Sequence, residues 1–249
     1  MSKSKMSHRV QLAPDIYKMT FETDSCRFSR PGQYVLIKTG GECRPYQVCD
    51  YDSERYTVVF KATDKYGQEL AGIGFGGEVE SETGLGNGFD VDAVPDNSVL
   101  VADSMGVIEM LELARALLIR GKKFKMVLGF NNKDSIVMMD SFRNICNELE
   151  VLTLDGSNGR EGMASDAVRN ADYVCASGTP AMLKALSGRA KEGQFSLSMM
   201  MHVSHAEKGD FDVGTKSGMV KCSKAGPVFD KNIVDWNSLS LEHWNRSTY

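Results

Sequence analysis

The chain has 249 residues, of which 25% are charged and 42% hydrophobic, which allows two domains and excludes widespread disorder. Its formal net charge of −4 provides no basic surface for nucleic acid. No apolar run approaches the roughly 20 residues that cross a bilayer, and the start MSKSKMSHRV lacks the apolar core of a secretory signal. The six cysteines form no CxxC pair, which favours reduced thiols and a cytoplasmic location.

The first part of the chain, residues 1–94, predicts short strands separated by turns. Val, Tyr, Phe, Thr and Ile dominate the runs VQLAP, YKMTFET, QYVLIKT, YQVCDY and YTVVFKA. Turn sequences such as SRPGQ, KTGGE and DSER separate these runs. Strands at this spacing predict a small barrel or a sandwich, and periodicity alone does not choose between the two.

The pattern changes after the turn-rich AVPDNS at 93–98, a plausible domain boundary. Over 95–195, strand-like and helical runs alternate: NSVLVAD, VIEMLELARALLIRG, KFKMVLGF, SIVMMDSFRNICNE, LEVLTLD, ADYVCASG and TPAMLKALSGRA. Alternation of this kind predicts a parallel sheet with helices on both faces. The tail, 196–249, has no strong periodicity and is expected to be irregular.

The run RPYQV at 44–48 begins a predicted strand after a Gly-Gly turn. Arg44 before Pro45 places a cationic fork on a stiff backbone, which suits a phosphate or another anion. Tyr46 could lie against a planar ring. The alternative is a strand-start proline beside a surface arginine.

Two glycine-bearing stretches in the first part also suggest ligand binding. The run VVFKATDKYGQEL predicts a strand that continues into a loop at Gly67, where backbone amides could approach a phosphate. A simple turn glycine is the alternative. The run TGLGNGF at 83–89 holds more glycines than a single turn needs.

The strand–loop–helix VLVADSMGVIEML at 99–111 is where a dinucleotide pyrophosphate would lie on a helix amino terminus. This loop keeps only Gly106, and Asp103 or Ser104 could cap the helix instead. Because a carboxylate also repels a pyrophosphate, the loop argues against nucleotide binding. The loops DGSNGREG at 155–162 and ASGTPAML at 176–183 are further strand-end loops.

Residues 199–230 raise the question of a metal site. The side chains of His202, His205, Glu207 and Cys222 would suffice in number for zinc. However, Cys222 is distant along the chain, and such a mixture is more typical of a solvated loop. We therefore expect no metal site here.

Taken in order, several motifs resemble those of one family: PGQYVLIK, RPYQV, VFKATDKYGQEL, GLGNGF, LARALLIRG, VLGF, TLDGSNGREG, ASGTPAMLKAL and GPVFD. This family is the electron-transfer subunit of type B dihydroorotate dehydrogenase, one of the ferredoxin-reductase-like flavoproteins. The small subunits of sulfide dehydrogenase and of bifurcating ferredoxin:NADP oxidoreductases are similar, and the ending FDKNIVDW is closer to those. The resemblance spans roughly residues 8–240 and depends on the order and spacing of the motifs.

The resemblance implies a β-barrel plus α/β architecture. An FAD-binding antiparallel barrel would occupy 1–94, and a Rossmann-like NAD-binding sheet would occupy 95–195. The segment 196–249 would take the place of a [2Fe-2S] domain. The family's flavin motif and the following strand and loop imply these FAD-binding residues: Arg44, Pro45, Tyr46, Gln47 (in place of the usual Ser), Phe60, Lys61, Tyr66, Gly67 and Gln68.

The same resemblance implies that the nucleotide and cluster sites are degenerate. The family's GGGxGxxP loop stands here as residues 102–109, with Gly106 retained, and its CGP stands as Ser177-Gly178-Thr179. NAD(P)H binding is therefore expected to be weakened or lost. The cluster-ligand places fall on Val203, Lys208, Phe211 and Ser223, so no [2Fe-2S] cluster is expected.

These expectations combine into a flavoprotein of the electron-transfer-subunit type that passes electrons to a partner without a cluster. By resemblance, its partner would be a catalytic oxidoreductase subunit of pyrimidine biosynthesis, with self-association as the alternative. One alternative is a non-catalytic regulatory or structural relative that keeps the fold. Another is a stand-alone NAD(P)H–flavin reductase.

Overall fold

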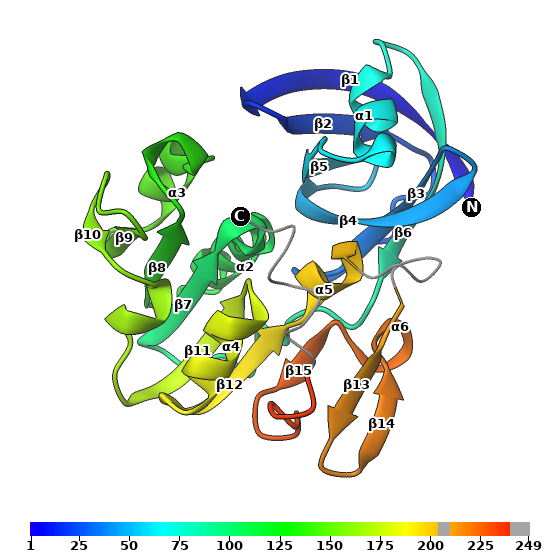
Figure 1. Ribbon diagram of the computed structural model, residues 1–249. Coiled ribbons are helices and arrows are strands. Elements are labelled where there is room, and N and C mark those ends of the chain that lie inside the picture. Colours follow the sequence, from blue (N-terminus) through cyan, green and yellow to red (C-terminus); the bar gives the residue numbers. More distant parts are fainter. Residues whose placement is uncertain (204–209, 240–249) are drawn as a thin grey trace.

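The computed structural model describes residues 1–203 and 210–239, apart from the side chains of His202 and Val203. A six-stranded barrel lies beside a seven-stranded sheet, and the tail packs where the two meet (Figure 1). Within the described part, no helix is both long and apolar enough to cross a membrane.

The first six strands close into an antiparallel barrel, in the order β1-β2-β5-β4-β3-β6. They are β1 (Ser2–Ala13), β2 (Ile16–Glu22), β3 (Tyr34–Thr39), β4 (Glu42–Tyr51), β5 (Arg55–Lys61) and β6 (Glu78–Leu85). The barrel rather than the sandwich is thus the correct alternative. The sequence pattern did not predict β6, because its inward residues include the small polar Ser81 and Thr83.

The predicted loop at Gly67 is wrong, because this residue lies in the first turn of helix α1 (Lys65–Gly72). Asp64 caps this helix by accepting the Gly67 amide at 2.7 Å. A Cβ on Gly67 would lie 2.7 Å from the carbonyl oxygen of Lys61. Glycine is therefore required for α1 to pack against the end of β5.

The seven-stranded sheet has the order β10-β9-β8-β7-β11-β12-β15, and every pairing is parallel except the last. Its strands are β7 (Ser98–Asp103), β8 (Phe124–Phe130), β9 (Leu149–Thr153), β10 (Arg160–Glu161), β11 (Ala171–Ser177), β12 (Ala190–Ser196) and β15 (Val228–Asp230). A mostly parallel sheet following a barrel confirms the predicted fold class. The sequence did not mark β12, because AKEGQFS mixes charge and glycine with only one large apolar residue.

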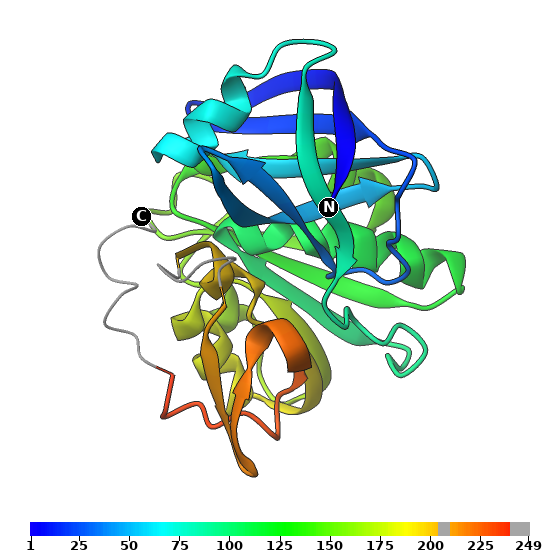
Figure 2. The same ribbon diagram turned by 90° about the vertical axis from the view of Figure 1, so that its right-hand side faces the viewer.

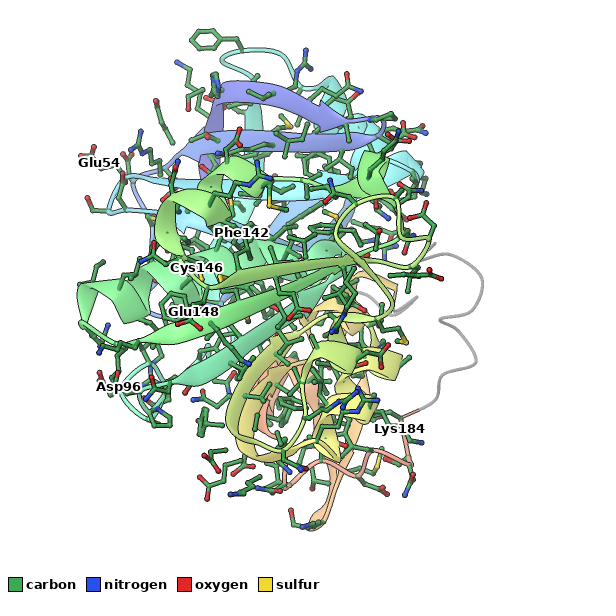
Figure 3. The ribbon with its side chains drawn as sticks, turned by 90° about the vertical axis from the view of Figure 1, so that its left-hand side faces the viewer. Glu54, Asp96, Phe142, Cys146, Glu148 and Lys184 are labelled. Atoms are coloured by element: carbon green, nitrogen blue, oxygen red, sulfur yellow. The ribbon has the colours of Figure 1, made fainter. Side chains whose placement is uncertain are left out.

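Helices cover both faces of this sheet, as predicted. Helices α2 (Val107–Ile119) and α3 (Met139–Ile145) lie on one face, and α4 (Pro180–Ser187) and the short helix η3 (Ala164–Ala167) lie on the other. Figure 3 shows Phe142 of α3 on the barrel side of the sheet and Lys184 of α4 on the far side. Helix α3 is shorter than the predicted run at 135–148, whose first residue, Ser135, belongs to the separate short helix η2 (Lys133–Ser135).

Helix α2 lies between the sheet and the barrel (Figure 2). Its buried side chains share one apolar cluster with Ile16, Cys49 and Val59 from the barrel strands. A helix that is apolar on most of its surface is typically buried on several sides. This packing brings the first turn of α2 against β4, where the flavin motif lies.

The tail is not irregular, so this part of the prediction is wrong for its described residues. It forms α5 (Ser198–Val203), the hairpin of β13 (Asp212–Thr215) and β14 (Gly218–Lys221), α6 (Cys222–Ala225) and the sheet strand β15. These elements are three to six residues long, too short to show periodicity.

The glycine-rich run 83–89 holds this tail in place. The Asn87 side chain accepts the amide of Val228 at 3.0 Å and donates to the carbonyl oxygen of Val228 at 2.6 Å. It also donates to the carbonyl oxygen of Ala225. The run therefore has a structural role in joining the barrel to the edge of the sheet.

Candidate functional site

The first candidate site is a cationic corner at the end of the barrel, where β4 meets α1. Arg44 donates to Glu42 at 2.7 Å, and its guanidinium lies 4.2 Å from the centre of the Tyr66 ring. The ammonium of Lys65 lies 4.6 Å from the same ring. The Nε of Arg44 is buried and has no hydrogen-bond partner among the described residues. A buried donor of this kind is costly unless a ligand satisfies it.

The amino terminus of α1 faces the same corner. The first amides of an α-helix, here those of Lys65 and Tyr66, have no partner within the helix, whereas the Gly67 amide is taken by Asp64. Free amides at a helix amino terminus favour an anion. The carboxylates of Glu42 and Asp64 oppose that preference. The pKa of Glu42 is lowered by its hydrogen bond to the Tyr66 hydroxyl and by the nearby Arg44 and Lys65.

These residues fit the diphosphate end of FAD. The unpaired Arg44 Nε, the Lys65 ammonium and two free amides form a set of donors suited to phosphate oxygens. Lys65 was not among the predicted residues. Its signal in the sequence is a basic residue directly before the Tyr-Gly pair at a helix start.

The remaining residues of the flavin motif do not all point to this corner. Successive side chains of a strand alternate between its faces, so Tyr46 lies inside the barrel while Pro45 and Gln47 face outward. The Tyr46 ring meets the Phe60 ring edge-on, with 5.5 Å between their centres, and burial raises the pKa of Tyr46 to about 12. Lys61 and Gln68 are exposed. The FAD assignments of these residues stay a prediction.

On the outward face, Gln47 belongs to a buried polar network centred on Glu109 of α2. The Gln47 amide donates to Ser198 at 2.8 Å and to Glu109 at 3.4 Å. Ser198 also donates to the same Glu109 oxygen at 2.7 Å, and Ser177 donates to it as well. The network therefore joins the barrel, α2, the end of β11 and the start of α5.

Glu109 is 1% exposed and forms no ion pair within the described residues. Burial raises its pKa, while the hydrogen bonds from Ser177, Ser198 and Gln47 counteract that effect. Glu109 was not among the predicted site residues. Its signal was one of two acids, Glu109 and Glu112, in the mainly apolar run VIEMLELA, positions that sequence alone would assign to an exposed face.

The second candidate site comprises the loops at the carboxyl ends of β7 and β11, where a dinucleotide would be expected. Here Asp103 does not cap the helix that follows it. Its carboxylate instead accepts the Thr179 amide at 2.6 Å and the Thr179 hydroxyl at 2.7 Å. The capping prediction is therefore wrong, because Asp103 finds a better partner across the sheet edge. Burial raises the pKa of Asp103 to about 6, although both hydrogen bonds from Thr179 act to lower it.

The space beside both retained glycines of these loops is occupied by atoms of the protein itself. A Cβ on Gly106 would lie 2.3 Å from the carbonyl oxygen of Ser177, and one on Gly178 would lie 2.0 Å from Asp103 Oδ1. Ser104 adopts a φ of 51°, a left-handed conformation that favours glycine. The backbone thus follows a glycine-type path, and the room that the glycines provide is used for internal packing.

These loops do not fit the pyrophosphate of a dinucleotide. Asp103 already occupies the amide and hydroxyl of Thr179, and its negative charge would face the phosphates. A second carboxyl, Glu109, occupies the first turn of α2 in place of the family's proline. We therefore assign no role in catalysis to a nucleotide bound here.

The metal hypothesis falls largely on residues that the structure does not describe. His205, Glu207 and Lys208 lie outside the described residues, as do the side chains of His202 and Val203. Within the described ranges, 1–203 and 210–239, no group of three or more His, Cys, Asp or Glu side chains could hold a metal. Cys222 is fully buried, and burial raises the pKa of its thiol.

Comparison with known proteins gives one consistent result, although no family model matches the chain. The electron transfer subunit of dihydroorotate dehydrogenase B (NAD(+)) from Clostridium perfringens is 28% identical over 246 residues, covering 94% of this chain and 98% of that protein. The same subunit from Bacillus cereus strain ATCC 14579 is 30% identical over 206 residues, covering 77% and 79%.

Solved structures agree with these relatives. The NADH-dependent reduced ferredoxin–NADP oxidoreductase, studied for flavin-based electron bifurcation, superposes with a TM-score of 0.81 at 27% identity, covering 95% of this chain and 91% of that one. Phthalate dioxygenase reductase superposes with a TM-score of 0.63 at 15% identity, covering 88% and 75%, which shows the fold alone.

Proposed function

The chain belongs to the family of electron transfer subunits of dihydroorotate dehydrogenase B, and from this membership we propose an FAD-dependent electron-transfer subunit. In this proposal it receives electrons from a partner rather than from a bound NAD(P)H, and it uses no [2Fe-2S] cluster. Residues 1–94 would hold FAD, 95–195 would be the degenerate nucleotide domain, and 196–249 would replace the cluster domain.

The observation that carries the FAD proposal is the unpaired, buried Nε of Arg44 beside the free amides of α1. Arg44, Lys65 and those amides would bind the diphosphate. A bound flavin couples two-electron and one-electron partners. The chain's own contribution would be to hold the diphosphate at the corner where β4 meets α1.

Two carboxyl groups at the second site support a subunit without a nucleotide donor. Asp103 holds the amide and the hydroxyl of Thr179, and Glu109 adds a buried carboxyl to the first turn of α2. Electrons must then come from, and go to, cofactors on a partner protein. The relatives are electron transfer subunits of a dehydrogenase, which supports a heteromer with a catalytic oxidoreductase subunit over self-association.

A non-catalytic relative is the second candidate, and one observation favours it. The Tyr66 ring covers the Arg44 guanidinium, and the carboxylates of Glu42 and Asp64 supply internal counter-charges there. The chain could thus keep the barrel stable without a cofactor. The stand-alone NAD(P)H–flavin reductase receives no such support, since it requires the nucleotide site.

The absorption spectrum of the purified chain, before and after incubation with FAD, tests the proposal. We expect flavin bands at one FAD per chain, no bleaching on anaerobic addition of NADH, and bleaching with a strong chemical reductant such as dithionite. A folded protein that cannot bind FAD would leave the non-catalytic candidate. Bleaching by NADH would favour the flavin reductase. Stoichiometric iron with acid-labile sulfide would refute the absence of a cluster.

A further inference from the structure

We propose that Asp103 is a specificity-determining residue whose carboxylate acts as an internal anion at the amino end of α4 and thereby excludes the diphosphate of NAD(P)H. This inference deepens the proposed function, because it names the residue that makes the subunit independent of a nucleotide. It also goes beyond the loss of glycines in the loop. That loss by itself would only leave a phosphate less room to approach the loop backbone.

Asp103 takes up two donors at the amino end of α4 that an anion could otherwise bind. One carboxylate oxygen accepts the backbone amide of Thr179 at 2.6 Å, and the other accepts its hydroxyl at 2.7 Å. Thr179 is the N-cap residue of α4, so the contact lies where the helix dipole attracts an anion. An incoming phosphate would have to displace both hydrogen bonds.

The Asp103 carboxylate also fills the space beside Gly178. Asp103 Oδ1 lies 2.0 Å from where a Cβ on Gly178 would stand, so the carboxylate packs directly on the backbone of that glycine. Within the described residues, Asp103 forms no ion pair with Lys or Arg. Its negative charge is therefore balanced only by hydrogen-bond donors, and a second anion would meet uncompensated repulsion.

The other departures from the family loop do not account for the exclusion as directly. Ser104 keeps the left-handed backbone of a glycine, with φ at 51°, so the path of the loop is preserved. Glu109 accepts hydrogen bonds from Ser177, Gln47 and Ser198 in the buried network and takes neither donor of Thr179. Of these residues, only Asp103 accepts the amide and the hydroxyl of Thr179, the N-cap residue of α4.

The test compares the wild-type chain with D103G, D103N and a matched control, D134N. Asp134 lies in η2, which follows β8 at the same sheet edge, and it is exposed, so D134N changes the same charge without touching Thr179. NADH is titrated by its fluorescence, and inorganic pyrophosphate is titrated by its effect on the melting temperature. FAD content is measured separately on each protein.

We expect D103G to bind NADH at least about tenfold more tightly than wild type, with a smaller gain for D103N and none for D134N. Pyrophosphate should raise the melting temperature of D103G only. D103N retains an acceptor for Thr179, so it keeps the test valid if D103G unfolds. Unchanged NADH and pyrophosphate binding in folded D103N and D103G would overturn this inference and leave the proposed function standing. Tight NADH binding by the wild type, with bleaching of its flavin, would overturn both.

Discussion

The Arg44 corner and the Asp103 loops are the two places where phosphate groups would be expected, and they differ in what the protein does with its hydrogen-bond donors. At the corner, a buried guanidinium nitrogen has no acceptor among the described residues, and two first-turn amides of α1 have none within the helix. At the loops, the protein's own carboxylate takes the amide and the hydroxyl of Thr179. The motif of each site is altered in sequence, but only the corner keeps donors for a ligand.

The retained glycines also distinguish a motif in the sequence from a ligand site in the structure. Gly67 and Gly106 both come from motifs that suggest ligand binding, yet each makes close contact with a carbonyl oxygen of the protein itself. A retained glycine is therefore weak evidence for a phosphate site. An unsatisfied buried donor is stronger evidence, because leaving it unpaired costs free energy.

The largest expected effect comes from G106A, which would break the second site by overpacking. Its new Cβ would lie 2.3 Å from the Ser177 carbonyl oxygen, so the start of α2 must move. We expect a loss of about 3 kcal/mol in the free energy of unfolding, measured in urea. G72A in α1, where a Cβ meets nothing within 4 Å, is the control and should be neutral or slightly stabilising. Equal stability of G106A and G72A would contradict the packing role.

Glu109 gives the next largest effect. E109A leaves Ser177, Ser198 and Gln47 without their shared acceptor and should cost about 2 to 3 kcal/mol, whereas E109Q should cost less. Because burial raises the Glu109 pKa, its proton is held more tightly in the folded state. The wild type should therefore lose stability as the pH rises above the ordinary carboxyl pKa, and E109Q should lose less. Parallel pH profiles would argue against this role.

At the corner, R44Q should weaken FAD binding about tenfold, because it removes the cation and the unpaired Nε together. The quenching of flavin fluorescence on titration measures this affinity. K38Q is the control, since Lys38 pairs with the exposed Glu80 on the barrel surface. Equal FAD affinity of R44Q and K38Q would remove the corner from the site.

The melting temperatures of D103N and wild type, compared across pH, test the charge of Asp103 at the loops. Burial raises the Asp103 pKa from 3.8 to about 6, so the folded protein binds this proton more tightly than the unfolded chain. The associated stabilisation is present below about pH 4 and is lost as the pH rises through about 6. D103N should therefore gain in melting temperature relative to wild type between about pH 4 and about pH 7. A constant difference would count against the raised pKa.

The smallest expected effect is a gain in stability from S104G. Ser104 has a φ of 51°, where a non-glycine residue is strained. Glycine should raise the free energy of unfolding by about 0.5 to 1 kcal/mol, after subtraction of its greater entropy when unfolded. A calorimetric scan of S104G against wild type measures this difference, and a lower melting temperature would show that the Ser104 side chain has a stabilising contact.

The sequence predicted the elements with strong apolar patterns and missed those without them. Runs such as YTVVFKA and KFKMVLGF became strands because their alternation or continuity fits a buried sheet. Strand β6 was missed because its interior residues are small and polar, and β15 because it has only three residues. Pairing with β12, not local propensity, makes β15 a strand.

The sequence predicted the motifs of the site but not which of their residues contact each other. The sequence indicated that Asp103 would act locally, yet its partner Thr179 is 76 residues away. It gave no sign that Gln47 and Glu109 would meet, because that contact depends on α2 lying against β4. Long-range packing therefore decided which of the predicted residues share a site.

The attachment of the tail by Asn87 has a consequence for how the chain folds. Asn87 follows the last barrel strand, but its hydrogen-bond partner Val228 is synthesised 141 residues later. During synthesis the barrel strands can close early, while the loop that follows them waits for the end of the tail. Contacts of such sequence separation slow folding. A nascent or shortened chain ending before β15 would expose both an unpaired edge of β12 and an unsatisfied Asn87, which makes it a natural target for chaperones and proteases.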